Sequence, residues 1–179
     1  MKLFFSEFRI YFCNQWICNI PSQDLRLWYY RKIMKFSISK GSYVFMGCSF
    51  DCSENLYLGK NSVINAKCRI DTRGKVIIGE NVSISNDVTI LTADHDMNTY
   101  NLQGRIRDVK IGDYVWIGTR ALIMPGVIVG KGAIVAAGSI VTKNVEPFQV
   151  VAGVPARTIR KRPAEKDFEY NASYKRLFQ

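Results

Sequence analysis

The side chain in this sequence best suited to proton transfer is that of His95, the only histidine in the chain. It lies in a polar segment, residues 92–110, where Asp94 and Asp96 flank it. An imidazole takes up and releases a proton near neutral pH, and a neighbouring carboxylate can orient the ring or raise its basicity. The sequence does not show which aspartate does so, if either. A lone histidine is more often structural, but its polar setting favours a role as a general base.

Other kinds of catalysis find little support. The chain has no Gly-x-Ser-x-Gly sequence and no cysteine near His95, so direct transfer is favoured over a covalent intermediate. A zinc site built from three imidazoles at an interface of two chains would need more than one histidine per chain. The five cysteines form no Cys-x-x-Cys pair, so we expect neither a metal nor a disulfide framework. They are Cys13, Cys18, Cys48, Cys52 and Cys68, and the last three are predicted to occupy turn or core positions.

Aliphatic residues recur every six positions through much of the chain. They stand at Ile111, Ile117, Ile123, Val129, Val135 and Val141, and most are followed by glycine or alanine. The same phase appears at Leu58, Ile64 and Ile70, resumes after a two-residue slip at Ile78, Ile84 and Ile90, and extends weakly back to Met46 and Cys52. A period of six fits neither an α-helix nor a single strand, but it is typical of β-helices. The repeat therefore predicts a solenoid of short strands around an aliphatic column.

The elements around the repeat should position the candidate histidine. Residues 92–110 have no six-residue phase and are expected to leave the solenoid as a loop, whereas residues 72–74 look like a small bulge. The segment from Phe4 to Lys35 predicts two helical pieces broken at Pro21, residues 147–162 a compact closing turn, and residues 165–179 a short polar helix or tail. The expected division is a helical segment 1–43, a β-helix domain 44–162 and a tail 163–179.

The chain is strongly basic, with a formal charge of +10 and a pI near 9.5. This excess suits a nucleotide cofactor, a nucleic acid or an anionic membrane surface, but no aromatic-basic module accompanies it, so nucleic acid is not expected as a partner. No secretory signal or membrane-spanning run is apparent, which predicts a cytoplasmic protein. The aromatic and basic residues 1–40 are expected to pack on the solenoid or on a neighbouring subunit. Peripheral contact with the inner face of a membrane stays open as an alternative.

Five motifs stand in order along the repeat. They are Thr92-Ala93-Asp94-His95-Asp96, Ile111-Gly112-Asp113-Tyr114-Val115-Trp116-Ile117-Gly118, Pro125-Gly126-Val127, Ala136-Ala137-Gly138-Ser139-Ile140-Val141-Thr142-Lys143 and Ala152-Gly153-Val154-Pro155-Ala156-Arg157. Together they resemble the hexapeptide-repeat acetyltransferases, a family that includes galactoside and maltose acetyltransferases and enzymes that O-acetylate capsule, colanic acid or lipopolysaccharide sugars. The resemblance covers roughly residues 44–162. It implies a left-handed parallel β-helix, a homotrimer with sites between subunits, and acetyl-CoA as the acyl donor.

The resemblance also implies roles for individual residues. His95 falls where the family keeps its general base. The residues that fall along the cofactor are Trp116, Gly118, Thr119, Ala137, Thr142, Lys143, Arg157 and Arg160, and the two arginines fall where cations meet its phosphates. Asn65 matches a position that holds the sugar acceptor in the galactoside enzyme, and Asp71 and Asp94 are further candidates for acceptor binding. Asparagine is also common at β-helix turns, so a structural role for Asn65 stays open.

The sequence thus predicts an O-acetyltransferase that acts on a sugar hydroxyl, in the manner of the polysaccharide-modifying branch. Two alternatives stay open. The first keeps the class and changes the acceptor to an amine on a nucleotide-linked amino sugar, or to a xenobiotic of the streptogramin type. The second is a binding scaffold without catalysis, which the ordered cofactor motifs disfavour.

Overall fold

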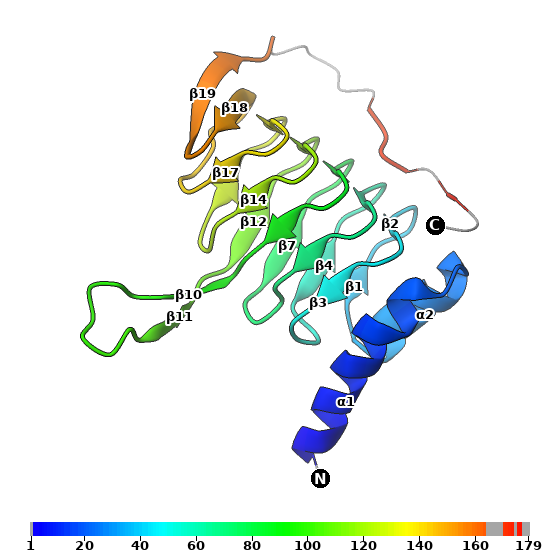
Figure 1. Ribbon diagram of the computed structural model, residues 1–179. Coiled ribbons are helices and arrows are strands. Elements are labelled where there is room, and N and C mark those ends of the chain that lie inside the picture. The colour runs from blue at the N-terminus through cyan, green and yellow to red at the C-terminus, as the bar shows by residue number, and fades with distance from the viewer. Residues whose placement is uncertain (1, 164–169, 174, 177–179) are drawn as a thin grey trace.

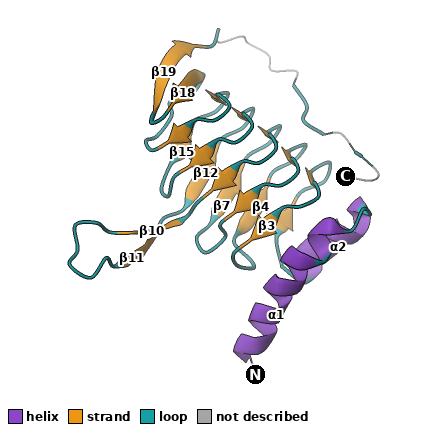
Figure 2. Ribbon diagram, in the orientation of Figure 1, coloured by secondary structure: helices purple, strands orange, loops and turns teal. Residues whose placement is uncertain are grey.

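The computed structural model describes residues 2–163, 170–173 and 175–176. Figures 1 and 2 show a solenoid of short strands with two helices packed at its N-terminal end and a hairpin projecting from its side. The helices are α1 (Lys2–Gln15), the 3-10 helix η1 (Ile17–Asn19) and α2 (Gln23–Lys32). The strands are β1 (Ser37–Ile38), β2 (Tyr43–Val44), β3 (Ser49–Phe50), β4 (Leu56–Leu58), β5 (Val63–Ile64), β6 (Arg69–Ile70), β7 (Val76–Ile78), β8 (Ser83–Ile84), β9 (Thr89–Ile90), β10 (Ala93–His95), β11 (Gly104–Ile106), β12 (Val109–Ile111), β13 (Trp116–Ile117), β14 (Leu122–Ile123), β15 (Ile128–Val129), β16 (Ile134–Val135), β17 (Ile140–Val141), β18 (Gln149–Gly153) and β19 (Ala156–Lys161).

The strands stack into three parallel sheets, one for each face of the solenoid. The sheet orders are β1-β4-β7-β12-β15, β2-β5-β8-β13-β16 continued by β18-β19, and β3-β6-β9-β14-β17. Each turn of the chain adds one strand to each sheet, and the last residue of each two-residue strand points inward. These inward residues form a continuous column in which Ile64, Ile84, Ile117 and Val135 have no exposed surface. The predicted aliphatic column is confirmed.

The turns of the solenoid differ in length, which explains the slip in the repeat. Ser37 pairs with Tyr57 and Tyr57 with Ile77, a step of 20 residues, whereas Lys110 pairs with Ile128, a step of 18. In the first turn the inward residues are Val44 and Phe50, which are at most 1% exposed. The weak extension of the repeat to Met46 and Cys52 was therefore wrong, because each of the first two turns carries two extra residues at its last corner and shifts the phase.

The helices close the N-terminal end of the column. Ser22 caps α2 by accepting a hydrogen bond from the N–H of Leu25, directly after Pro21, so the predicted two-piece helix is confirmed. Tyr30 and Phe50 pack edge to face with ring centroids 5.4 Å apart, which joins α2 to the solenoid. Six aromatic and aliphatic residues of this segment divide between two sides: Ile17, Leu27 and Tyr29 are buried, whereas Trp16, Leu25 and Trp28 are exposed. Within the described ranges, none of the helices has the length and apolar character needed to cross a bilayer.

The opposite end and the tail follow a different pattern. β18 pairs in parallel with β16 and antiparallel with β19, so the predicted closing turn is a hairpin that covers the last coil. Of the predicted helix or tail at residues 165–179, residues 170–173 and 175–176 are described and are not helical; the others lie outside the described residues. Ala172 packs with Phe45 and Val63, and Lys175 forms an ion pair with Asp24 of α2.

The aliphatic column should carry much of the stability. Ile84→Ala removes a side chain with no exposed surface and is expected to lower the free energy of unfolding by about 2–5 kcal/mol, because it leaves a cavity. Ile159→Ala makes the same change on β19, where the side chain is 61% exposed, and should cost less than about 0.5 kcal/mol. Urea denaturation followed by circular dichroism measures both, and equal losses would contradict the column as the source of stability.

Candidate active site

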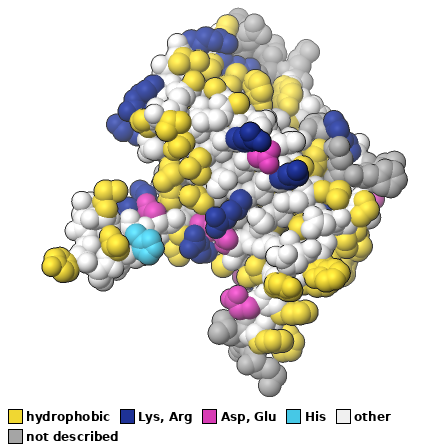
Figure 3. Space-filling model, viewed as in Figure 1, with side chains coloured by type: hydrophobic (Ala, Val, Ile, Leu, Met, Phe, Trp, Pro, Cys, Tyr) yellow, Lys and Arg dark blue, Asp and Glu magenta, His cyan; other side chains and the backbone are white. Residues whose placement is uncertain are grey.

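The predicted loop is a β-hairpin that carries His95 away from the solenoid. The chain leaves after β9, forms β10 and β11, and returns as β12, which takes its place beside β7 (Figure 1). The hairpin is antiparallel, and His95 pairs with Gly104. The side chain of His95 is exposed, and Figure 3 shows it at the base of the projection, close to charged side chains. A hairpin anchored at both ends gives the histidine a fixed position without burying it.

The imidazole is oriented by a backbone carbonyl. Nδ1 of His95 lies 2.6 Å from the carbonyl oxygen of Leu102, on the returning arm of the hairpin. A carbonyl oxygen only accepts hydrogen bonds, so Nδ1 carries the proton, and Nε2 of the neutral ring is left as the proton acceptor. Leu102 has a φ of +48°, in the left-handed region that non-glycine residues rarely adopt. This turn conformation brings its carbonyl to the ring.

The two flanking aspartates hold arginines instead of the imidazole. Asp94 accepts two hydrogen bonds of 3.0 Å from Arg105 and one of 2.6 Å from Arg107. These bonds lower the pKa of Asp94, and those from Arg105 have the larger effect. Asp96 lies 3.1 Å from Nη1 of Arg105. The group that orients the imidazole is thus the carbonyl of Leu102 and neither of the flanking aspartates. Asp94, which was expected to bind the acceptor, instead braces the hairpin.

A buried carboxylate fixes the base of the hairpin. Asp71 has no exposed surface, and its oxygens accept hydrogen bonds from the side chain of Arg73 and from the N–H groups of Arg73, Thr92 and Ala93. Burial opposes ionisation of Asp71, but the bonds from Arg73 and Thr92 outweigh it and lower the pKa to about 2. Gly74 adds a hydrogen bond from its N–H to Thr92. Asp71, expected to contact the acceptor, is therefore placed as a support beneath the hairpin.

His95 and Arg73 share one cavity. It has a volume of about 420 Å³ and is lined by Arg73, Ala93, Asp94, His95, Gly104, Arg105 and Ile106. The sequence missed Arg73, because residues 72–74 looked like a minor bulge in the repeat. An arginine two residues after an aspartate, at a break in phase, was the available signal. Asn65, the other expected acceptor residue, lies at a different corner, where its amide donates to the carbonyl of Ile84 at 2.7 Å. It does not line this cavity.

The expected cofactor residues lie on the later coils. Trp116 is 51% exposed, and its ring nitrogen donates to Ser85. It lines a cavity of about 350 Å³ together with Tyr114, Ile134, Arg162 and Tyr170. Gly118 is a point of close approach between coils, because a Cβ there would lie 2.5 Å from the backbone nitrogen of Ala137. Among the described residues, the N–H groups of Thr119 and Ala137 have no hydrogen-bond acceptor, and both residues are exposed.

The expected phosphate-binding cations are partly brought together. Lys143 and Arg157 line a cavity of about 170 Å³ with Val141, Asn144, Val145, Gln149, Val151, Ala156 and Thr158. Thr142 is the exposed neighbour of Lys143, so it lies at the same corner. Arg160 is exposed on β19 opposite Val150 and does not line this cavity. Of the two arginines expected at the phosphates, Arg157 therefore lines this cavity together with Lys143, and Arg160 does not.

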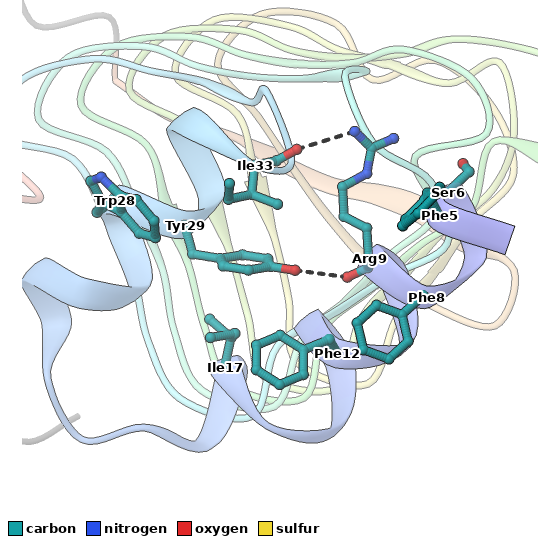
Figure 4. Close-up of a pocket in the computed structure, with 9 residues that line it drawn as sticks. All are labelled: Phe5, Ser6, Phe8, Arg9, Phe12, Ile17, Trp28, Tyr29 and Ile33. Carbon is teal, nitrogen blue, oxygen red and sulfur yellow. Dashed lines mark hydrogen bonds between the residues drawn. The ribbon is translucent and has the colours of Figure 1, made fainter. Parts of the chain in front are cut away.

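A further cavity, of about 690 Å³, lies between α1 and α2, and few of its lining residues are polar (Figure 4). Its walls are mainly aromatic: Phe5, Phe8, Phe12, Trp28 and Tyr29 line it with Ser6, Arg9, Ile17 and Ile33. The guanidinium of Arg9 donates to the carbonyl of Ile33, and the hydroxyl of Tyr29 donates to the carbonyl of Arg9. It therefore lacks a group poised for proton transfer. The part of the chain that the structure describes contains no group of three or more His, Cys, Asp or Glu residues that could hold a metal.

Comparison with known proteins identifies the class. Residues 108–143 match the family model described as bacterial transferase hexapeptide (six repeats). The galactoside O-acetyltransferase of Escherichia coli (strain K12) is 33% identical over 147 residues, which are 80% of this chain and 72% of that protein. The chain belongs to the hexapeptide-repeat acetyltransferases.

Solved structures agree on the fold. A galactoside acetyltransferase in complex with coenzyme A is 29% identical, with a TM-score of 0.78 over 92% of this chain and 84% of that one. A maltose O-acetyltransferase from Clostridium difficile 630 is 31% identical, with a TM-score of 0.81 over 89% and 87% of the two chains. The solenoid is accordingly a left-handed parallel β-helix, as predicted, and the protein is an acyltransferase.

Asp71 should control the anchoring of the hairpin. Asp71→Ala removes the acceptor for Thr92 and Ala93, so hydrogen exchange at these amides should accelerate at least about tenfold, the effect of one lost hydrogen bond of ~1.4 kcal/mol. Because the folded pKa of Asp71 is about 2, below that of an unfolded aspartate, its stabilising effect is complete above about pH 4 and fades as the pH falls towards 2.

Asp51→Ala is the matched control, since Asp51 directly follows β3 and the change breaks its ion pair with Arg69. It should leave exchange at Thr92 and Ala93 unchanged. Equal protection of the two amides in Asp71→Ala and in the unmodified protein would show that the hairpin is anchored by other contacts.

Proposed function

We propose that the protein transfers an acetyl group from acetyl-CoA to a hydroxyl group of a sugar, with His95 as the general base. The observation that carries this proposal is the hydrogen bond from Nδ1 of His95 to the carbonyl of Leu102. It fixes the tautomer and leaves Nε2 as a proton acceptor at a cavity. Relatives that share the fold are named for galactosides and maltose, which supports a sugar as the acceptor.

The chemistry asked of His95 is a simple proton relay. Acetyl-CoA supplies an activated acyl carbonyl. Nε2 takes the proton of the acceptor hydroxyl as its oxygen attacks that carbonyl, and the imidazolium returns the proton to the departing thiolate sulfur, so the free base is regenerated. The positive charge on the ring is stabilised by the Leu102 carbonyl, which accepts the Nδ1 proton throughout. This mechanism needs neither a covalent intermediate nor a metal.

The later coils provide features that suit acetyl-CoA. The unpaired N–H groups of Thr119 and Ala137 are donors for amide carbonyls of a pantetheine arm or for the oxyanion, beside the gap that Gly118 leaves. The exposed ring of Trp116 offers an apolar face. Lys143 and Arg157 offer cations for phosphates, with Thr142 next to Lys143 and Arg160 further along β19, the strand of Arg157. These hydrogen-bond donors and cations therefore suit acetyl-CoA, the predicted cofactor.

A homotrimer is the assembly that we propose. On the sheet β1-β4-β7-β12-β15, the outward residues Tyr57, Ile77 and Ile128 are 39%, 36% and 44% exposed and stack in one column that Lys110 interrupts. Large exposed apolar residues in register are typical of an interface between copies. Such an interface would place the hairpin of one subunit against the coils of its neighbour and could bring Asn65 to the acceptor.

The outer face of the N-terminal helices is a candidate surface for contact with a partner. Six aromatic residues on α1, on α2 and directly after α1 are each more than 50% exposed and form an aromatic outer face: Phe4, Phe5, Phe8, Tyr11, Trp16 and Trp28. We favour contact of this face with a neighbouring subunit, and a membrane that carries a polysaccharide precursor is the alternative. The division into a helical segment 1–43, a catalytic β-helix 44–162 and a tail 163–179 belongs to the same proposal, although β1 shows that the first coil begins at Ser37.

Removing the general base tests the mechanism. His95→Ala should lower turnover at least about a hundredfold, because the acceptor hydroxyl loses its base, while the Kd for acetyl-CoA changes less than about twofold. Asn101→Ala, an exposed position on the same hairpin, is the control and should retain activity. Acceptor-dependent CoA release across sugars, amino sugars and a streptogramin measures the rates. Turnover that survives in His95→Ala would require a different base, and transfer to amines alone would select the N-acyltransferase alternative.

The column on β4, β7 and β15 tests the assembly. Ile77→Glu places a charge in the proposed interface, so the particle mass in light scattering should fall from about three times the chain mass of 20.4 kDa to that of one chain. Ile159→Glu makes the same change at an exposed position on β19 and should leave the mass unchanged. A trimer that persists in Ile77→Glu would exclude this face as the interface.

A further inference from the structure

The cavity of His95 has an unequal distribution of charge between its surface and its base. Arg73, Arg105 and Asp94 line it, and Asp71, Asp96 and Arg107 form ion pairs with these three residues. The side chains of Arg73, Arg105 and Arg107 are 46%, 34% and 46% exposed. Those of the acidic partners Asp71, Asp94 and Asp96 are only 0%, 22% and 26% exposed. The guanidinium groups are thus more exposed than their carboxylate partners, which favours an anionic ligand.

Arg73 is the arginine best placed to bind a ligand. Its Nε and Nη2 each donate to the buried Asp71 at 2.9 Å, which holds the guanidinium plane in place. Among the described residues, its Nη1 has no acceptor, and Arg73 lines the same cavity as His95. Arg105, by contrast, spends its three nitrogens on Asp94 and Asp96. A preorganised guanidinium with unused N–H donors is the usual partner of carboxylate and phosphate groups.

Arg73 is not the sole support of the hairpin. Asp71 already receives the N–H groups of Thr92 and Ala93, so the base of the hairpin has donors that do not depend on a charged side chain. Nearly half of the surface of the Arg73 side chain nevertheless faces solvent at the cavity. A cavity of about 420 Å³ is within the range that takes a small ligand such as a monosaccharide unit.

We propose that the acceptor sugar carries an anionic substituent, a carboxylate or a phosphate, which Arg73 binds while His95 deprotonates a hydroxyl group of the same sugar unit. The proposal rests on the acetyltransferase function proposed above and names its substrate class. Arg105 adds positive charge at the cavity wall, although most of its N–H donors are engaged by Asp94 and Asp96. Arg73 then determines specificity and does not take part in the proton relay.

Matched acceptors test the proposal. Rates of CoA release are measured with a neutral methyl hexoside, the corresponding methyl hexuronoside and the corresponding hexose phosphate. The unmodified protein should show a kcat/KM at least about tenfold higher for one or both anionic acceptors, and 0.5 M salt should reduce this preference. The two anionic arms distinguish a carboxylate from a phosphate. Preference for the neutral hexoside would overturn the proposal.

Variants assign the preference to Arg73. In Arg73→Gln the ratio of kcat/KM between the anionic and the neutral acceptor should fall at least about tenfold. Arg73→Lys keeps a charge for Asp71 and so preserves folding, but it loses the planar fork and should also lose most of the ratio. Arg69→Gln is the matched control, since Arg69 pairs with Asp51, which follows the neighbouring strand β3, and does not line the cavity. A ratio that survives in both Arg73 variants would contradict the proposal.

Binding separates this proposal from the function on which it rests. If no acceptor is acetylated, the methyl hexuronoside and inorganic phosphate are titrated calorimetrically into the unmodified protein and into Arg73→Lys. Binding that is at least about tenfold weaker in the variant would support an anion site even though the transferase proposal had failed. Equal affinity, or absence of binding to both proteins, would overturn the anion site.

Discussion

The close stacking of coils on the aliphatic column determines where every functional group of this protein lies. Inward residues such as Ile84, Ile117 and Val135 have no exposed surface, so the coils cannot slide or rotate without opening a cavity. The outward residues are consequently fixed in register from coil to coil. Gly118 shows how tight this constraint is, because a single added carbon would collide with the backbone of the next coil at Ala137. The unpaired donors at that corner are a result of the same packing.

The hairpin is the one long departure from this regularity, and its position depends on the coils below it. Thr72 and Thr92 stand 20 residues apart at equivalent corners, and each uses its hydroxyl to join neighbouring turns: Thr72 with Cys52, and Thr92 with Asp71 and Gly74. The chain therefore leaves the solenoid from a corner that is hydrogen-bonded on both sides. Asp71 completes the anchor by receiving the first two N–H groups of the outgoing segment. His95 owes its position to these contacts together with the ion pairs of Asp94 and Asp96 with Arg105 and Arg107.

The sequence was sufficient for the parts of the structure that repeat. The aliphatic period predicted the column, the break at Pro21 predicted two helical pieces, and the polar segment 92–110 predicted the projection with His95 on it. Prediction from the sequence failed where irregular corners and single backbone contacts determine the structure. The phase at Met46 and Cys52 was wrong because the corner lengths of the first coils do not appear in a six-residue pattern. The contact with the Leu102 carbonyl could not be predicted, because every residue type carries a carbonyl and only the fold brings this one to the imidazole. Arg73 was missed for a related reason, since its importance comes from Asp71 and the hairpin, not from a motif.

The irregular coils and the regular coils carry residues with different proposed roles. The regular coils, with a step of 18 residues, carry Trp116, Gly118 and Lys143, which are the groups suited to a donor common to a whole family. The earlier coils, with a step of 20, carry extra residues at the corner that includes Asp71 and Arg73. Two additional residues leave the aliphatic column intact, because they lie outside the strands that form it. They can therefore vary at little cost to folding, whereas changes at Gly118 cannot. On the roles proposed above, the acceptor is recognised where the repeat tolerates insertion, and the donor is bound where it does not.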